Sequence, residues 1–194
     1  MKVDKKISVI IPTYQDDTAL SSLLRKLANM NIDEIIISDG ENRLKLPGHM
    51  RKNGMTVTHL YSSLGRGPQI KAGINLSQHP FIWILHTDNQ PHDDAPNHIR
   101  KYLEEPELSL LKFTLGFSQP SWGLKLFSWF ARWDSPISTF GDQVYAFRRM
   151  DYEALDLDLD NYPLLEDVAL RHALKTKGRV KRSPLKIMTS ARRF

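Results

Sequence analysis

Three carboxylates in this 194-residue chain have neighbours that suit catalysis. Asp88 closely follows a very hydrophobic run at 81–85 (FIWIL). A carboxylate there can hold Mg²⁺ or Mn²⁺ against the oxygens of a diphosphate, and the cation stabilises a leaving diphosphate as a Lewis acid. Glu166 and Asp167 open a segment with helical apolar spacing, and one of them can take the proton of an attacking hydroxyl group. The plainer explanations are a turn after a strand for Asp88 and a favourable helix-dipole interaction for the acidic pair.

Two further segments suit a nucleotide. The carboxylate of Asp39 can accept hydrogen bonds from a base N–H or a ribose hydroxyl, although Asp-Gly is also a common turn pair. Residues 65–69 (GRGPQ) open a predicted helix, where glycines let the backbone approach a phosphate and the helix N-terminus favours an anion. Arg66 can add a charge-assisted contact. The spacing fits neither a P-loop nor G-x-G-x-x-G, so a turn with a surface arginine explains it equally well.

Three further aspartates have a spacing that resembles a metal-binding loop. Asp156, Asp158 and Asp160 have D-x-D spacing, and Asp167 stands twelfth from Asp156. An EF-hand needs glycine where Asn161 stands and usually glutamate at the twelfth position. We therefore interpret this segment as a loop or a helix end.

The elements that must position these residues follow from hydrophobic periodicity. Short apolar runs predict strands over 7–11, 34–38, 56–61 and 81–85, and helical spacing predicts helices over 17–30 and 65–76, with a loop over 40–54. Strands that alternate with helices indicate a mostly parallel α/β sheet flanked by helices. Polar residues follow the strands, and open α/β sheets bind ligands at the carboxyl ends of their strands, so we expect a nucleotide-like ligand there.

The second half is expected to finish the sheet and to build the acceptor side. Strands are predicted over 109–117 and 143–147, and helices over 122–133 and 164–177. The segment 122–133 (WGLKLFSWFARW) is most simply a buried or dimer-forming helix. The sharper alternative is peripheral contact with a membrane or a lipid-like acceptor, where tryptophan and basic residues are typical.

Composition bounds the protein class. The chain is 41% hydrophobic and 25% charged, which is typical of a globular protein. The absence of cysteine excludes disulfides, thiolate zinc sites and cysteine nucleophiles. No signal peptide or membrane-spanning run is evident, so we expect a cytoplasmic protein. Its length predicts one domain over 1–194, with a nucleotide-binding half over about 1–90 and an acceptor-side half over about 91–194.

The formal net charge of +5 is concentrated at the C-terminal end. No acidic residue follows Asp167, whereas nine basic residues do: Arg171, Lys175, Lys177, Arg179, Lys181, Arg182, Lys186, Arg192 and Arg193. Such a segment prefers an anion, and a solvated basic face explains it equally well. Because it carries no recognised nucleic-acid-binding motif, we expect no nucleic-acid partner.

Taken in order, the motifs resemble the family 2 glycosyltransferases, which have the GT-A fold. The similarity covers nearly the whole chain, and the ordered set is specific although each piece is weak. The matching segments are 7–14 (ISVIIPTY), 37–40 (ISDG), 65–67 (GRG), 86–88 (HTD), 141–143 (GDQ), 165–168 (LEDV) and 189–193 (TSARR). Within the family, the chain looks most like a small bacterial branch identified as arsenosugar-biosynthesis or selenodomain-associated transferases.

The resemblance implies a donor site for a nucleotide-diphospho-sugar. Pro12 and Tyr14 line the nucleotide, Asp39 contacts the base or ribose, and Arg66 lies near the diphosphate or ribose. The patterns GRG-x-Q and GDQ add further substrate-binding residues: Gln69, Asp142 and Gln143.

The resemblance also implies the reaction. Asp88 is the last acidic position of a motif that binds Mg²⁺ or Mn²⁺, and Asp167 is the general base of the Glu166–Asp167 pair. The sugar passes to a hydroxyl acceptor of unknown identity with inversion at the anomeric carbon. Alternatives are a nucleotidyltransferase on a similar sheet, or a catalytically degenerate module that binds a nucleotide or an anionic lipid, peripheral at the inner membrane face.

The chain departs from the family pattern at several positions. His86 stands where many relatives carry aspartate, which lowers the expected metal affinity. Glu41 and Asn42 follow Gly40 where relatives often have Gly-Ser, and Pro68 replaces a small residue. The chain stops at Phe194, where relatives commonly continue with another helix, which predicts incomplete acceptor recognition or membrane docking.

Overall fold

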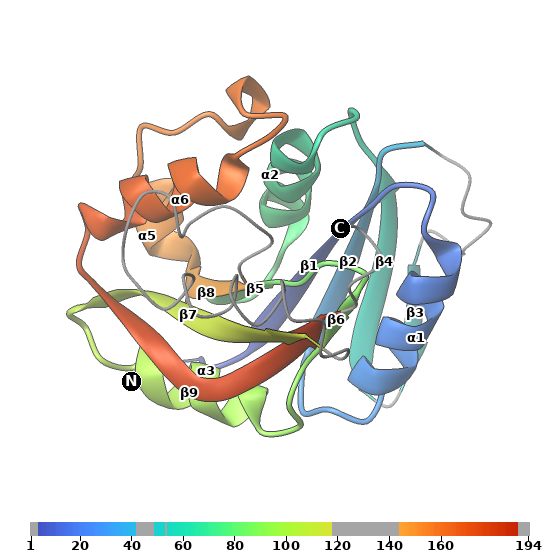
Figure 1. The fold of residues 1–194 in the computed structure, drawn as a ribbon, viewed down its shortest axis with the longest axis horizontal. Coiled ribbons are helices and arrows are strands. Elements are labelled where there is room, and N and C mark those ends of the chain that lie inside the picture. Colours follow the sequence, from blue (N-terminus) through green and yellow to red (C-terminus); the bar gives the residue numbers. More distant parts are fainter. Residues whose placement is uncertain (1–3, 42–48, 53, 118–143, 190–194) are drawn as a thin grey trace.

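Alternating hydrophobic side chains place a twisted sheet between two layers of helices (Figure 1). The computed structural model describes residues 4–41, 49–52, 54–117 and 144–189. Within these residues one sheet contains nine strands in the order β3-β4-β2-β1-β5-β8-β7-β9-β6. Strands from both halves of the chain therefore share one sheet.

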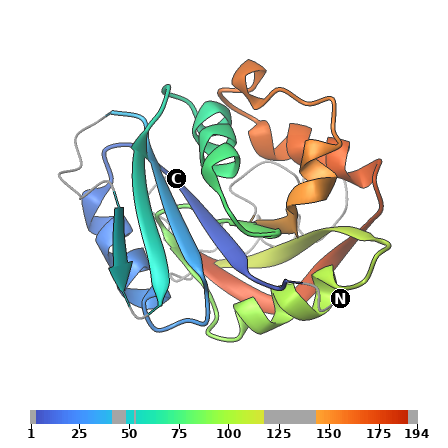
Figure 2. The same cartoon turned by 180° about the vertical axis from the view of Figure 1, so that it is seen from behind.

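The first half alternates strands and helices as predicted. The strands β1 (Ile7–Thr13), β2 (Glu34–Asp39), β4 (Met55–Tyr61) and β5 (Phe81–Ile84) are parallel to one another. Helix α1 (Asp17–Leu27) follows β1, and α2 (Arg66–Leu76) follows β4. The predicted loop over 40–54 was wrong in part, because β3 (His49–Lys52) pairs antiparallel with β4 and forms the sheet edge seen in Figure 2.

The second half completes the sheet with strands of both directions. Its strands are β6 (Asn89–Gln90), β7 (Leu108–Phe117), β8 (Tyr145–Arg148) and β9 (Arg179–Thr189). Its helices are α3 (Ala95–Leu103), α5 (Arg149–Glu153), the 3₁₀ turn η2 (Leu159–Asn161) and α6 (Glu166–Lys175). Among the described strands, β3, β6 and β8 oppose the other six, so the sheet is mixed with a parallel centre.

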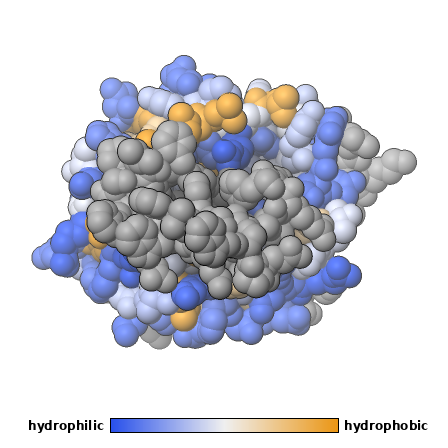
Figure 3. Space-filling model, in the orientation of Figure 1, coloured by the Kyte–Doolittle hydropathy of each residue, from blue (hydrophilic) through white to orange (hydrophobic). Residues whose placement is uncertain are grey.

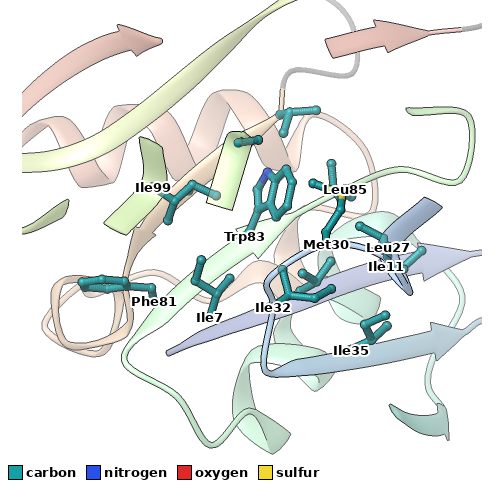
Figure 4. Close-up of a cluster of buried hydrophobic side chains, with 14 of the residues drawn as sticks. Ile7, Ile11, Leu27, Met30, Ile32, Ile35, Phe81, Trp83, Leu85 and Ile99 are labelled. Atoms are coloured by element: carbon teal, nitrogen blue, oxygen red, sulfur yellow. The ribbon is translucent and has the colours of Figure 1, made fainter. Parts of the chain in front are cut away.

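Strand alternation divides the core into two clusters, one on each face of the sheet. On one face Ile7, Val9 and Ile11 of β1 pack with α1 and α3, and Figure 4 shows Trp83 and Ile99 in this cluster. On the other face the alternate residues, such as Ile10 and Ile84, pack with α2, α5, η2 and α6. The position of a residue in the alternation therefore decides which helices it meets.

The basic C-terminal segment contains α6 and β9, and β9 pairs parallel with β7. Lys181 lies 3.0 Å from Glu105 and 4.3 Å above the ring of Tyr102. Arg179 contacts Glu107 at 2.9 Å. Part of the basic charge is thus met by acidic residues of the same chain, as expected for a solvated face. The predicted helix over 122–133 lies outside the described residues.

Gly73 is where α2 comes closest to the central strand, and this closeness can be tested. A Cβ atom at Gly73 would lie 2.4 Å from Cγ2 of Ile10. Glycine to alanine inside a helix normally stabilises by about 1 kcal/mol. Here the clash with a stiff β-branched side chain dominates, so Gly73→Ala should destabilise the protein by about 1–3 kcal/mol in urea unfolding. Equal or higher stability would contradict this packing.

Gly116→Ala is the control for that substitution. Its added Cβ would meet the sulfur of Met188 at 2.7 Å, at the flexible end of a side chain that can move. We expect Gly116→Ala to lower the unfolding free energy by less than Gly73→Ala does.

Candidate active site

The parallel strands β1, β2, β4 and β5 all end at one edge of the sheet, and hydrogen bonds tie these ends together. Gly40 N–H donates to Thr13 C=O at 3.1 Å, which joins the ends of β2 and β1. The Thr87 hydroxyl donates to the Asp16 carboxylate at 2.7 Å, which joins the segments after β5 and β1. The polar residues that follow the strands therefore converge, as the alternating pattern predicted.

Gln69 fixes the distance between the two central strand ends. It is 2% exposed, and its amide nitrogen donates to Thr13 C=O at 2.6 Å and to Ser38 C=O at 2.8 Å. This geometry gives Gln69 a structural role beneath the site, because both hydrogen bonds go to the backbone. Its expected contact with the substrate stays a prediction.

Asp39 is buried at the end of β2 and has partners within the chain. One carboxylate oxygen accepts the Glu41 N–H at 3.0 Å, as in an aspartate turn. The other lies 3.4 Å from Nε2 of His59 on β4. No local pattern indicates His59, because only the register of β4 beside β2 brings it close to Asp39. The expected contact of Asp39 with a base or ribose stays a prediction.

The segment 86–89 forms a tight turn after β5. His86 N–H donates to the side-chain oxygen of Asn89 at 2.8 Å, and Asn89 N–H donates back to His86 C=O at 3.0 Å. Asp88 is 8% exposed, and one of its oxygens accepts the Thr189 hydroxyl at 2.8 Å. Asp88 is thus held between this turn and the end of β9.

A small, largely apolar pocket, with room for about one water molecule, lies on the face of the sheet that carries α2 and α6. Ile82 and Ile84 point to this face, so the alternation carries His86 to it as well. The pocket joins His86 to the acidic pair, and its lining residues are Ile70, Ile84, His86, Tyr145, Leu159, Glu166, Asp167 and Leu170. Asp88 is not among them, although it lies on the same turn as His86.

The acidic pair begins α6 in a constrained geometry. Leu165, directly before it, has φ of +63°, a left-handed conformation that costs a non-glycine residue free energy. Glu166 is 2% exposed and Asp167 is 8% exposed. The guanidinium Nε of Arg66 lies 3.2 Å from the Glu166 carboxylate. The predicted GRG segment and the predicted acidic pair are therefore direct neighbours.

The loops that lead into α2 and α6 are exposed. Leu64 is 60% and Leu164 is 69% exposed, whereas Glu166 is buried. Among the described residues on the face in Figure 3, hydrophobic atoms gather at the upper edge and hydrophilic atoms predominate elsewhere. Tyr14, expected at the nucleotide, is 44% exposed after β1, and Pro12 is buried within β1. Asp142 and Gln143 lie outside the described residues.

The acidic side chains do not form a metal cage. Within the described residues, no group of three or more His, Asp or Glu side chains is arranged to hold a metal ion. Asp88 offers one carboxylate, and Mg²⁺ commonly takes one or two carboxylates together with substrate phosphates. The site therefore fits a metal that is held jointly with a diphosphate. The D-x-D pair Asp158 and Asp160 instead binds Lys71, at 2.6 and 2.5 Å, as expected for a loop.

Comparison with solved structures identifies this arrangement as the GT-A fold. TarS from S. aureus superimposes with a TM-score of 0.67 at 15% sequence identity over 96% of this chain and 37% of TarS. TarS 1–349 in complex with UDP-GlcNAc superimposes with a TM-score of 0.64 at 17% identity, over 96% of this chain and 59% of that chain. The mannosyltransferase PcManGT from Pyrobaculum calidifontis, in complex with GDP-Man and Mn²⁺, superimposes with a TM-score of 0.63 at 14% identity. The match covers 96% of this chain and 59% of that chain.

Sequence comparison places the chain in a family. Residues 8–154 match the model of glycosyl transferase family 2, and the chain belongs to this family. A search of curated proteins gives no significant match. The chain spans between 37% and 59% of the length of the solved structures described above. No helix within the described residues is both long and apolar enough to cross a membrane.

Replacing Gln69 with leucine tests its structural role. The substitution keeps a side chain of similar size but removes both donated hydrogen bonds, so two backbone carbonyls each lose one accepted hydrogen bond. We expect Gln69→Leu to lower the unfolding free energy by about 1–3 kcal/mol in urea titrations.

Gln78→Leu is the matched control, because exposed Gln78 also donates to a backbone carbonyl, that of Leu76. It should change stability by less than about 0.5 kcal/mol. Unchanged stability of Gln69→Leu with lost nucleotide binding would instead make Gln69 a ligand contact.

Proposed function

We propose that this protein is an inverting glycosyltransferase that moves a sugar, most simply a hexose, from a nucleotide-diphospho-sugar to an acceptor hydroxyl. The single observation that carries the proposal is the pocket shared by His86, Glu166 and Asp167 at the carboxyl edge of the sheet. Family membership supports it. Two neighbours of the same fold hold UDP-GlcNAc and GDP-Man, which supports a donor of this class.

Asp167 serves as the general base in this proposal. The acceptor hydroxyl gives its proton to the Asp167 carboxylate while its oxygen forms a bond to the anomeric carbon. The bond from that carbon to the diphosphate oxygen breaks at the same time, and the electron pair leaves with the nucleoside diphosphate. A direct displacement from the opposite face inverts the anomeric centre.

Arg66 and Glu166 form an ion pair beside the proposed base, Asp167. Glu166 is buried at the first turn of α6, where the helix dipole and the guanidinium of Arg66 both stabilise its charge. Arg66 stands at the first turn of α2, and its guanidinium can add positive charge near the diphosphate. The donor is thus expected to lie near Arg66.

Asp88 would hold Mg²⁺ or Mn²⁺ in this scheme. When bound, the metal supplies positive charge to the leaving diphosphate. The neighbour PcManGT contains Mn²⁺ with its donor, which supports a divalent metal in general. Thr189 fixes the orientation of the Asp88 carboxylate through the hydrogen bond described above.

The finer classification rests on sequence motifs. The patterns in 65–69, 86–88 and 189–193 support the bacterial arsenosugar or selenodomain-associated branch. We further propose one domain over 1–194, with a nucleotide half over about 1–90 and an acceptor half over about 91–194. A cytoplasmic location with peripheral contact at the inner membrane face is supported by the composition of 122–133.

Asp167→Asn tests the base. The amide cannot accept the acceptor proton, so turnover with UDP-GlcNAc or GDP-mannose should fall at least about 100-fold, while donor binding by calorimetry stays nearly unchanged. Asp93→Asn, at an exposed carboxylate, is the control and should retain turnover. Full turnover by Asp167→Asn would refute the assignment, and release of pyrophosphate from a nucleoside triphosphate and a sugar phosphate would favour a nucleotidyltransferase.

Asp88→Ala tests the metal site in a thermal-shift titration with UDP or GDP. The wild-type protein should gain stability from the nucleotide mainly when Mn²⁺ is present, and Asp88→Ala should lose that metal-dependent gain. Thr189→Val removes the hydrogen bond that orients Asp88 but keeps the carboxylate, so it should lose only part of the gain. A metal-dependent gain of equal size in Asp88→Ala would show that the metal is held elsewhere.

A further inference from the structure

The residues that precede the acidic pair form a short arm, 158–165, which lies along the first turns of α2. Figures 1 and 2 both show the orange segment around η2 beside α2. The arm contains η2 and ends at Leu165, directly before Glu166. Its position therefore sets where α6 begins and where the Asp167 carboxylate lies.

Lys71 attaches the far end of the arm to α2. Its ammonium group lies 2.6 Å from the Asp158 carboxylate and 2.5 Å from that of Asp160. Asp158 also accepts the Asp160 N–H at 3.0 Å, so one carboxylate both caps η2 and binds the lysine. The hydrogen bond from Lys71 lowers the pKa of Asp158 below its usual range. The contact is therefore intact at neutral pH and is lost only as the pH falls through that lowered value.

The near end of the arm is attached by the first residues of α2. Arg66 N–H donates to Pro163 C=O at 3.1 Å, and Arg66 Nε lies 3.2 Å from Glu166. A Cβ atom at Gly67 would lie 2.1 Å from the Tyr162 carbonyl oxygen, so only glycine permits this approach. Backbone contact and ion pairs thus fix the arm from both ends.

The start of α6 requires such attachment. The left-handed Leu165 is a strained conformation that persists only when its surroundings over-determine it. Leu159, directly after Asp158 in the arm, is fully buried and lines the same pocket as Asp167. Movement of the arm would therefore change both the pocket wall and the base.

We propose that Lys71 is a positioning residue that holds the 158–165 arm and thereby sets the Asp167 carboxylate for proton transfer. The inference rests on the proposed role of Asp167 as base. Lys71 does not line the pocket, so it acts through the arm and not on the substrate. Because exposed ion pairs contribute little to global stability, the expected effect is on position and rate.

Lys71→Met tests the proposal by two independent readouts. Amide hydrogen exchange over 159–170 should become about tenfold faster, because the arm opens locally. The value of kcat, measured with whichever of UDP-GlcNAc and GDP-mannose the wild-type protein turns over, should fall about tenfold, since small misplacements of a catalytic group cost this much. The KM for the donor should stay unchanged.

Two variants provide the controls. Lys5→Met removes the exposed ion pair with Glu104, which lies away from the arm, and should leave exchange over 159–170 and kcat unchanged with a similar small shift in Tm. Lys71→Arg keeps the positive charge at this position and should therefore retain most of the wild-type kcat.

The outcomes separate this inference from the proposed function. Unchanged exchange over 159–170 in Lys71→Met would overturn it, and so would faster exchange with a wild-type kcat. Full turnover by Asp167→Asn would instead refute the base, and with it the link to catalysis, whatever the exchange shows. If neither donor is turned over, hydrogen exchange still decides whether Lys71 holds the arm.

Discussion

The candidate site depends on the contact between the first turns of α2 and α6. Each N-terminus carries a partial positive charge, and a buried glutamate, Glu166, lies at the contact with Arg66 beside it. The arrangement stabilises a buried carboxylate at α6, while the first turn of α2 meets carbonyl oxygens of the 158–165 segment.

Rigidity at this contact comes from backbone geometry more than from charge. Gly67 and Gly73 bring α2 against the arm and against β1, at distances that a side chain would not allow. Gln69, between them, joins the ends of β1 and β2 from below. One short helix thus connects the central sheet to the acidic pair, which explains the two glycines within it.

Much of this architecture is readable from the sequence, because the relevant signals are local. Periodicity predicts β1, β2, β4, β5, α1 and α2 closely. The strand β9 was not predicted, since its Pro184 and basic residues argue against a strand, and only pairing with β7 decides the outcome. Helix α3 was also not predicted, although its residues carry helical apolar spacing, because it is short and contains Pro96 in its first turn.

The acidic residues of the candidate site stand out in the sequence, but the residues that contact them do not. Asp88, Glu166 and Asp167 stand next to strong local signals, whereas Thr189 contacts Asp88 across 101 residues of sequence. His86 was noted as a departure from the family pattern. Its place in the pocket follows from the alternation Ile82, Ile84, His86, a signal that the sequence does contain. The attachment of Asp158 and Asp160 to Lys71 depends on the packing of η2 against α2, which no local pattern specifies.

The most direct test of the account is an experimental structure of the protein with UDP or GDP and Mn²⁺. The account predicts that the metal would be held by the Asp88 carboxylate together with the diphosphate of the nucleotide. It also predicts that Asp167 faces the terminal phosphate across the pocket that contains His86. A nucleotide bound away from the carboxyl edge of the sheet, with Asp88 and Asp167 opening onto different cavities, would contradict it.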